Sequence, residues 1–568
     1  MNLLLPQLDQ TGYSPGPNRV QSRIQQGTVL VFGLILCSLL LSGCGKRESK
    51  VDRATREGML LIGNGGEPKA LDPHLVTSVG DSAIMRAMFE GLVTYHPSND
   101  ATHAPGVAER WEANDKKTVW TFYLRKNAKW SNGDPVTAHD FVYSYHRILH
   151  PEMGAPYASM LYFLRNAKEY NTDKEGKVPF EDVGVKALDD YTLELTLPNP
   201  TPFLPDVLKH TTWLPVHKPT IEKYGGMTEH FTDWQKPGNS VSNGAFQVTK
   251  WRVGSYVRVE KNPYYWDKDN VKLNGVEFYA FENSFTEERA FRNGLIHKTY
   301  VVPPNLIPLY KEKKSPELRL EPYIGTYFYR FNCTNEVTGN VHLRRALSAA
   351  IDREQIVKYV TQAGEIPAYA FTPPTEGGYQ PPRRVKFDPA EAKEHLKNAG
   401  YAKGSDVPAF SLFINTSESH TAVAIAILDM WKTHLGIDPK KVTIKNQEWK
   451  VYQVTIQDLK YDVARSGWIG DYLDPKTFLS LFTSDDTNNH TGWANDEYDR
   501  LFAESDNIGD EAKRFEKLEQ LENVLLDELP ITPIYWYTTK YLLNDDVRNW
   551  NPLLLDNHPF KAVELIAD

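Results

Sequence analysis

A strand–helix–strand pattern in the C-terminal half of the chain restricts its fold more than any other feature. Residues 411–415 are mostly apolar and are predicted to form a short strand. Residues 416–435 carry Ala, Ile and Leu along one side of a predicted helix that ends at Gly436, and a second strand is expected at 442–444. Two strands joined by a helix at this spacing run parallel, so we predict an α/β fold whose sheet is covered by helices.

A further strand-like segment, 461–465, leads directly into the segment 466–471, which ends at Asp471. In open α/β sheets, ligands bind beyond the carboxyl ends of the strands. The place of Asp471 after this strand therefore predicts a ligand contact.

The N-terminal half carries strands of a different kind. Residues 119–124 and 191–197 alternate between apolar and polar side chains, as half-buried strands do. Asp189 and Asp190, just before the second strand, are typical of a hairpin turn. Because 568 residues are too many for one hydrophobic core, we expect several lobes, in which strands and helices are mixed.

The N-terminus has the features of an export signal. Its apolar run, 28–41, is about 14 residues long, whereas a membrane-spanning helix needs roughly 20. Small residues then lead into Cys44, a pattern that resembles the bacterial lipobox, in which the cysteine is acylated and becomes the first residue of the mature protein. We predict a lipoprotein signal peptide at 1–43, a lipid on Cys44 and a flexible tether at 44–56. An ordinary cleaved signal peptide is the alternative.

This interpretation places the mature protein outside the cytoplasm, in the periplasm or on the outer cell surface, and attached to a membrane by its lipid. Loss of the signal peptide and acylation of Cys44 would leave Cys333 alone, so no disulfide is expected within the mature chain. The net charge of −9, with both signs interspersed, argues against nucleic acid as the main partner.

The sequence lacks the motifs of the common enzyme and metal sites. It contains no HExxH, no GxSxG, no paired-cysteine motif and no phosphate-binding loop. The 16 histidines are scattered, and the glycines at 63–66 lack the rest of a dinucleotide fingerprint. We therefore predict a protein without enzyme activity, metal site or cofactor.

Several longer segments resemble one protein family. The segments EPKALDPH at 67–74, WSNGDPVTAHDFVYS at 130–144 and DVARSGWIGDY at 462–472 are similar to segments of the oligopeptide-binding proteins of bacterial ABC importers. These proteins belong to extracytoplasmic solute-binding protein family 5. The resemblance continues in order from about residue 60 to the C-terminus.

The resemblance implies a two-lobed periplasmic-binding-protein type II fold, often called a Venus flytrap, with an additional inserted domain. Lobe 1 would have a discontinuous core domain (57–89, 217–324 and 538–568) and the inserted domain (90–216). Lobe 2 would comprise 325–537. The lobes would close on a ligand by a hinge motion.

The resemblance also implies how any short peptide could be held, since each has an ammonium, a carboxylate and backbone amides. Asp471 matches the family position that pairs with the ammonium. Arg465 and His420 match positions that meet the carboxylate. Gly467 and Trp468 match a stretch that pairs with the peptide backbone, as an added strand does.

Other matched positions include two that line the pocket in the family and several that depart from its pattern. The lining positions are Tyr157 and Asn488. The departures are Thr77, Thr361 and Ile456, where ionisable groups are frequent, Val302, where an amide is, and Gly325 and Ile469, where some members have a disulfide. Arg330 stands where an acid is common. The ligand carboxylate is therefore expected at Arg465, His420 or Arg330, and the side-chain preference stays open.

The leading interpretation is a monomeric, lipid-anchored binding component of an ABC importer. It would capture short peptides and deliver them to the permease subunits in the membrane. A binding protein for murein peptides or another small solute, a sensor that presents its ligand to a receptor, and an enzyme on the same scaffold are the alternatives.

Overall fold

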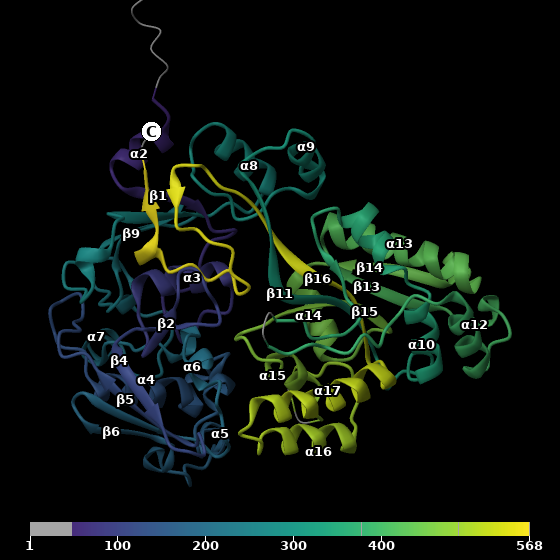
Figure 1. Cartoon of the computed structure of the whole chain (residues 1–568), viewed down its shortest axis with the longest axis horizontal. Coiled ribbons are helices and arrows are strands. Elements are labelled where there is room, and N and C mark those ends of the chain that lie inside the picture. The colour runs from purple at the N-terminus through teal and green to yellow at the C-terminus, as the bar shows by residue number, and fades with distance from the viewer. Residues whose placement is uncertain (1–47, 376–377, 485, 487, 567–568) are drawn as a thin grey trace, which may run out of the picture. The chain divides into compact units, whose positions relative to one another are not determined.

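The predicted strand–helix–strand unit is present and forms part of a six-stranded mixed sheet (Figure 1). The computed structural model describes residues 48–375, 378–484, 486 and 488–566. In it, β13 (Phe410–Asn415) and β14 (Val442–Gln447) run parallel and are joined by α13 (Glu418–Leu435). The other strands of the sheet are β11 (Leu318–Phe331), β12 (Ile366–Pro367), β15 (Val463–Ile469) and β16 (Ile531–Leu542). The strand order is β12-β16-β11-β15-β13-β14.

The sequence of α13 explains how this helix covers the sheet. It begins after Ser417 and ends at Gly436, whose φ of 74° lies in the left-handed region that glycine tolerates. Apolar side chains recur every three or four residues along one face, so that face is buried. The buried residues are Val423, Ala424, Ile427, Trp431 and Leu435.

Strand β15 is longer than the sequence predicted. We expected a strand that ends at Arg465, but β15 continues to Ile469. The extension depends on tertiary structure. All of β15 pairs with part of β11, from Ile469 opposite Gly325 to Val463 opposite Phe331. Asp471 still follows the carboxyl end of the strand, as predicted.

Two four-stranded sheets lie in the N-terminal half. One has the order β1-β10-β9-β8 and consists of β1 (Met59–Gly63), β10 (Gly275–Tyr279), β9 (Tyr256–Lys261) and β8 (Phe246–Arg252). The other has the order β4-β5-β7-β6 and consists of β4 (Ala108–Ala113), β5 (Val119–Leu124), β7 (Thr192–Thr196) and β6 (Val185–Asp189). The two alternating strands and the hairpin between β6 and β7 are confirmed.

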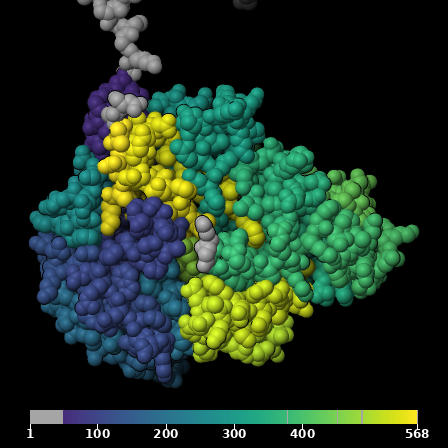
Figure 2. Space-filling view, in the orientation of Figure 1, coloured from purple at the N-terminus to yellow at the C-terminus, as the bar shows by residue number. Residues whose placement is uncertain are grey.

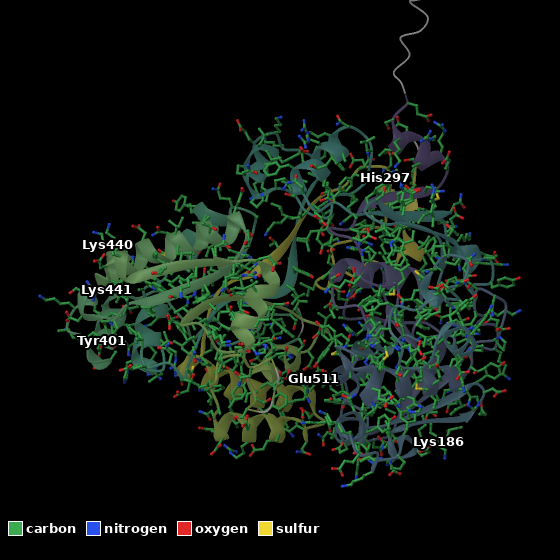
Figure 3. All side chains as sticks on the ribbon, turned by 180° about the vertical axis from the view of Figure 1, so that it is seen from behind. Lys186, His297, Tyr401, Lys440, Lys441 and Glu511 are labelled. Atoms are coloured by element: carbon green, nitrogen blue, oxygen red, sulfur yellow. The ribbon has the colours of Figure 1, made fainter. Side chains whose placement is uncertain are left out.

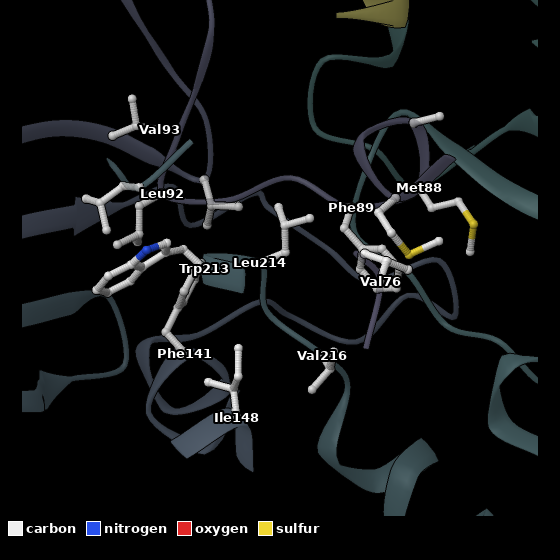
Figure 4. Packing of buried hydrophobic residues seen from close by; sticks show 14 of the residues in the cluster. Val76, Met88, Phe89, Leu92, Val93, Phe141, Ile148, Trp213, Leu214 and Val216 are labelled. Carbon is white, nitrogen blue, oxygen red and sulfur yellow. The ribbon is translucent and has the colours of Figure 1, made fainter. Parts of the chain in front are cut away.

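One hydrophobic core connects these two sheets. It includes Leu60 of β1 and Phe122 of β5, and both side chains are fully buried. Figure 4 shows Phe141 and Ile148, from α4 (Ala138–Leu149), beside Trp213 within this core. Residues before 90, within 90–216 and after 216 therefore share one core.

The chain passes between its halves along two long antiparallel strands, β11 and β16. Their pairing is irregular between Pro322 and Thr326. Figure 3 shows Lys440 and Lys441 at the outer end of the six-stranded sheet, far from Lys186 on the four-stranded sheet that contains β6. From Lys50 onward, the chain forms one unit.

Most of the predicted tether that the structure describes is folded and packed on the rest of the chain. Residues Lys50–Arg56 form helix α2, with Val51, Ala54 and Thr55 buried. Ala54 packs with Met59 and Leu61 of β1. The prediction of a flexible segment is thus wrong for 50–56, because the apolar face of α2 packs on the sheet. The predicted signal peptide and Cys44 lie outside the described residues.

The remaining α-helices of four or more residues pack around the sheets. They are α3 (Val79–Met88), α5 (Ala167–Thr172), α6 (Leu204–Val207), α7 (Lys218–Tyr224), α8 (Ser284–Arg292), α9 (Ile307–Glu312), α10 (Val341–Ala349), α12 (Pro389–Asn398), α14 (Trp449–Gln457), α15 (Lys476–Leu479), α16 (Asp496–Ser505) and α17 (Glu511–Glu528). Within the described ranges, every helix is too short or too polar to span a bilayer.

Candidate functional site

A cavity of about 1370 Å³ lies at the carboxyl end of β15. Small-molecule sites usually occupy about 300–1,000 Å³, so this cavity has room for a longer ligand. Its walls include residues of the 64–69 stretch and the start of α3, the 156–172 stretch, Arg330 of β11, helix α14, and β15 with residues that follow it as far as 490. In Figure 2 the segment with α4–α7 (blue) abuts the segment with α16 and α17 (yellow-green), and Arg514 of α17 lies 4.7 Å from the ring of Phe203.

Asp471 lines the cavity just beyond β15, where its carboxylate is held in place by Thr477. The Asp471 N–H donates to Thr477 Oγ1 (3.0 Å), and that hydroxyl donates to Asp471 Oδ2 (3.3 Å). Burial raises the pKa of Asp471 to about 7, although the Thr477 hydrogen bond works in the opposite direction. No cation therefore stabilises the ionised form of this carboxylate, and a cationic group of a ligand would stabilise it strongly.

His210 and Tyr157, which come from a different part of the chain, lie close to Asp471. His210 Nε2 lies 4.0 Å from Asp471 Oδ1, and the rings of His210 and Tyr157 are 5.8 Å apart. Burial, with a smaller contribution from Arg86, lowers the pKa of His210 to about 4, so this imidazole is neutral near pH 7. Its Nδ1 accepts from the Thr212 N–H, which leaves the Nε2 proton directed at Asp471. No sequence motif marked His210.

Arg465 is a second ionic group on the cavity wall. Its Nη2 donates to the Tyr537 hydroxyl (2.7 Å) and its Nη1 to Asn415 Oδ1 (3.4 Å). The guanidinium lies 4.7 Å from the ring centroid of Tyr327. Its Nε has no hydrogen-bond partner, and no carboxylate of the described chain forms an ion pair with it. Arg465 therefore presents an uncompensated positive charge.

His420, on the first turn of α13, is beside this group but is not among the residues that line the cavity. Its Nδ1 is 3.4 Å from the Tyr327 hydroxyl, and the two rings are 5.5 Å apart. Burial lowers the pKa of His420 to about 3, and the charges of Arg465 and Lys540 add to that effect. A neutral His420 can orient Tyr327, but it does not add a second cation.

Arg330 projects from β11 into the same cavity and is only 7% exposed. Its Nη2 donates to Ser466 Oγ (2.8 Å), whereas Nε and Nη1 have no partner. Burial lowers the pKa of Arg330, and the nearby Arg465 guanidinium contributes in the same direction. Arg330 and Arg465 thus form a cationic region of the wall.

Between these cations and Asp471, β15 has one free edge. Strand β13 pairs with β15 only at Val463 and Ala464, and past that point no described strand pairs on that side. The carbonyl oxygen of Arg465 accepts from the Tyr452 hydroxyl, which faces the edge rather than β11. Because strand amides alternate in direction, the N–H and C=O of Gly467 point to the same free edge.

The environment of Gly467 explains its lack of a side chain. A Cβ at this position would lie 2.4 Å from the Tyr537 hydroxyl oxygen, which is closer than two such atoms approach. Trp468, the next residue, lines the cavity and its indole N–H has no partner among the described residues. Gly467 therefore lies at the free edge, whereas the backbone of Trp468 pairs with Thr326 of β11 and its side chain faces the cavity.

The other singled-out positions divide between the cavity and the interior. Thr77, Ile456, Tyr157 and Asn488 line the cavity. Two others do not: Thr361 donates to Glu365 (2.8 Å), and Val302 is buried among apolar residues. Gly325 and Ile469 are opposite each other on β11 and β15.

The described residues include no cluster of three or more His, Cys, Asp or Glu side chains that could hold a metal ion. The site instead combines a buried carboxylate, two buried guanidiniums and an unpaired strand edge. These groups can bind a zwitterionic, extended ligand through ionic and backbone hydrogen bonds.

Comparison with known proteins agrees with this geometry. Residues 102–490 match the family described as bacterial extracellular solute-binding proteins, family 5 (middle). The chain is 39% identical to the periplasmic oligopeptide-binding protein OppA of Salmonella typhimurium over 537 residues, which cover 92% of this chain and 95% of that protein.

Two solved structures are similar over almost their whole length. The Haemophilus influenzae OppA complex with the peptide RPPGFSPFR superposes with a TM-score of 0.77 at 34% identity, covering 90% of this chain and 99% of the other. The murein tripeptide-binding protein MppA of Escherichia coli has a TM-score of 0.78 at 32% identity, covering 89% and 98%. The two-lobed binding-protein fold predicted from the sequence is therefore confirmed. The chain belongs to family 5 of the bacterial extracellular solute-binding proteins, whose members bind solutes and are not enzymes.

Proposed function

We propose that the protein is the lipid-anchored binding component of an ABC peptide importer, which captures short peptides by their termini and backbone. The arrangement of the cavity supports this function: it has an unpaired carboxylate at one end, unpaired guanidiniums at the other and a free strand edge between them. Asp471 would receive the peptide ammonium. Arg465, supported by His420 and Tyr327, would receive the carboxylate. Gly467 would pair with the peptide backbone, Trp468 would contact the peptide through its side chain, and Tyr157 and Asn488 would complete the wall.

The spacing of the charged groups favours peptides of a few residues. Six residue steps separate Arg465 from Asp471, which corresponds to at most roughly 20 Å, because β15 ends at Ile469. The reach of the two side chains shortens this span, so a peptide of about three to five residues fits between them. Peptides of this length bind mainly through groups that all peptides share, so the site would tolerate many sequences.

A thermal-shift series tests the peptide-binding function. We expect mixed tri- to pentapeptides to raise the melting temperature, because a ligand that binds only the folded state stabilises it, by about 2.7 kcal/mol at a concentration 100 times Kd. Di- to nonapeptides, a murein tripeptide, a sugar and a metal chelate should be compared. A shift with the sugar or the chelate but with no peptide would contradict the proposal. A shift with the murein tripeptide alone would favour the role that MppA's name describes.

The lipid on Cys44 requires its own test. We expect Cys44→Ala to release the protein from the membrane fraction of the producing bacterium, since the hydrophobic anchor is lost. Cys333→Ala, which removes the cysteine outside the predicted signal region, should leave the protein in that fraction. Mass spectrometry should find acyl groups on the N-terminal peptide of the wild type. A membrane-bound Cys44→Ala protein would contradict the anchor.

A further inference from the structure

Arg330 is a buried cation that the binding of peptide termini does not require. Its side chain is 7% exposed, and two of its three nitrogens have no partner. No Asp or Glu of the described chain lies within ion-pair distance of it. A buried charge without a counter-charge is costly, so a binding site with this arrangement favours an anion from the ligand.

Arg330 and Arg465 stand on opposite faces of the sheet. Arg330 is opposite Ala464 in the ladder of β11 and β15, whereas Arg465 is opposite Tyr329. Directly opposed residues share a face and successive residues alternate, so the two guanidiniums project to different sides. One carboxylate at the strand edge therefore cannot be shared easily by both, and the site can receive two separate anionic groups.

The surroundings of Arg330 are polar but contain no competing acid. Ser466 Oγ accepts one hydrogen bond from it. His490 lines the same part of the cavity, and burial together with the Arg330 charge lowers its pKa to about 4, so it is neutral near pH 7. The Tyr461 hydroxyl donates its proton to the His490 carbonyl oxygen. A ligand carboxylate is the group that would complete this environment.

We propose that Arg330 forms a second anion subsite, which makes the cavity prefer peptides that carry an acidic side chain in addition to their terminal carboxylate. The inference rests on the proposed peptide-binding function and names a substrate class within it. A peptide added along β15 directs successive side chains to alternate faces, and one of these reaches Arg330. Ser466 is five residue steps from Asp471, at most roughly 17 Å, and the reach of the Asp471 and Arg330 side chains shortens this span, so we expect the acidic residue at the third or fourth position of the peptide.

The test uses tetra-alanine and its variants with Glu or Gln at the second, third or fourth position. Binding to the wild-type protein is measured by calorimetry. We expect Glu to bind about 10- to 100-fold more tightly than Gln at the third or fourth position, as a charge-assisted hydrogen bond would give. At the second position, we expect no such ratio. If no position discriminates Glu from Gln although the peptides bind, the subsite is overturned and the peptide-binding function stands. If neither tetra-alanine nor any variant binds, the anion subsite and the peptide-binding function are both overturned.

Variants identify Arg330 as the residue responsible. Arg330→Gln should abolish the Glu/Gln ratio while tetra-alanine binds within a few-fold of the wild type. Arg330→Lys should retain part of the ratio, and Arg330→Glu should reverse the preference towards a lysine peptide. Arg110→Gln changes an exposed arginine, 59% exposed on its side chain, and should leave the ratio unchanged. A ratio that persists in Arg330→Gln would overturn the assignment. The melting temperature without peptide should not fall in that variant, because the replaced charge has no counter-charge.

Discussion

Replacing Asp471 by alanine is expected to weaken the binding of a short peptide by about 2–5 kcal/mol, measured by calorimetry on the wild type and the variant. The peptide ammonium would be buried in the complex without its partner, and this accounts for most of the loss. The groups described near the carboxylate include Thr477, Tyr157, Tyr472 and the neutral His210. None of them can replace an anion.

A matched peptide and a matched variant distinguish this contact from a general disturbance. An N-acetylated peptide has no ammonium, so Asp471→Ala should change its affinity little. Asp190→Ala removes a carboxylate whose side chain is 68% exposed on the surface, and should bind both peptides as the wild type does. Equal losses for the free and the acetylated peptide in Asp471→Ala would show that Asp471 does not bind the ammonium.

The same contact gives a pH signature. Burial raises the pKa of Asp471 to about 7 in the free protein, and a bound ammonium would stabilise its ionised form. Binding must therefore displace a proton at lower pH, so the affinity for a free-amine peptide should fall below about pH 7, by up to about tenfold per unit. His210, with its pKa lowered to about 4, stays neutral through most of this range. The acetylated peptide should show no such fall.

Replacing Arg147 by methionine is expected to reduce the free energy of unfolding by about 3–5 kcal/mol, measured by urea unfolding. Arg147 Nη1 and Nη2 donate to the two carboxylate oxygens of Asp72, at 3.0 and 2.6 Å, and both side chains are 0% exposed. Burial alone would raise the pKa of Asp72, but the Arg147 guanidinium outweighs it and holds that pKa below its usual value. Without Arg147 the carboxylate would be buried and unpaired.

The control for this prediction is again an arginine on the surface. Arg110→Met breaks an exposed contact with Glu112 and should cost less than about 1 kcal/mol. The double variant Arg147→Met with Asp72→Asn should recover part of the loss, because no charge then stays buried. If Arg147→Met is no less stable than Arg110→Met, the buried pair is not a source of stability.

The elements that could be predicted from the sequence depend on local patterns. The period of α13, its glycine stop and the flanking strands lie within one continuous segment, and so do the alternating strands β5 and β7. The extension of β15 to Ile469 could not be predicted, because it depends on pairing with β11, far away in the chain. For helix α2, the polar composition suggested a tether, but its small apolar face is sufficient to pack on β1.

In the candidate site, too, features set by local sequence could be predicted, and features set by contacts between distant segments could not. Asp471 was predicted because a general rule connects strand ends with ligands, and the family resemblance singled out Arg330 and Arg465. The sequence could not reveal that both arginines lack a carboxylate partner in the described structure, since this depends on every residue around them. His210 was missed for a similar reason: its approach to Asp471 depends on how distant segments fold together. The roles of these residues in binding stay predictions.

The free edge of β15 also bears on aggregation. An unpaired strand edge accepts any extended chain, and exposed edges are where proteins associate into larger assemblies. Here the edge is only a few residues long, from Arg465 to Ile469, and it faces a cavity rather than the outer surface. The walls around it limit the length of chain that can pair. The free edge of β15, which is suited to binding many peptides, is thereby prevented from pairing with strand edges of neighbouring molecules.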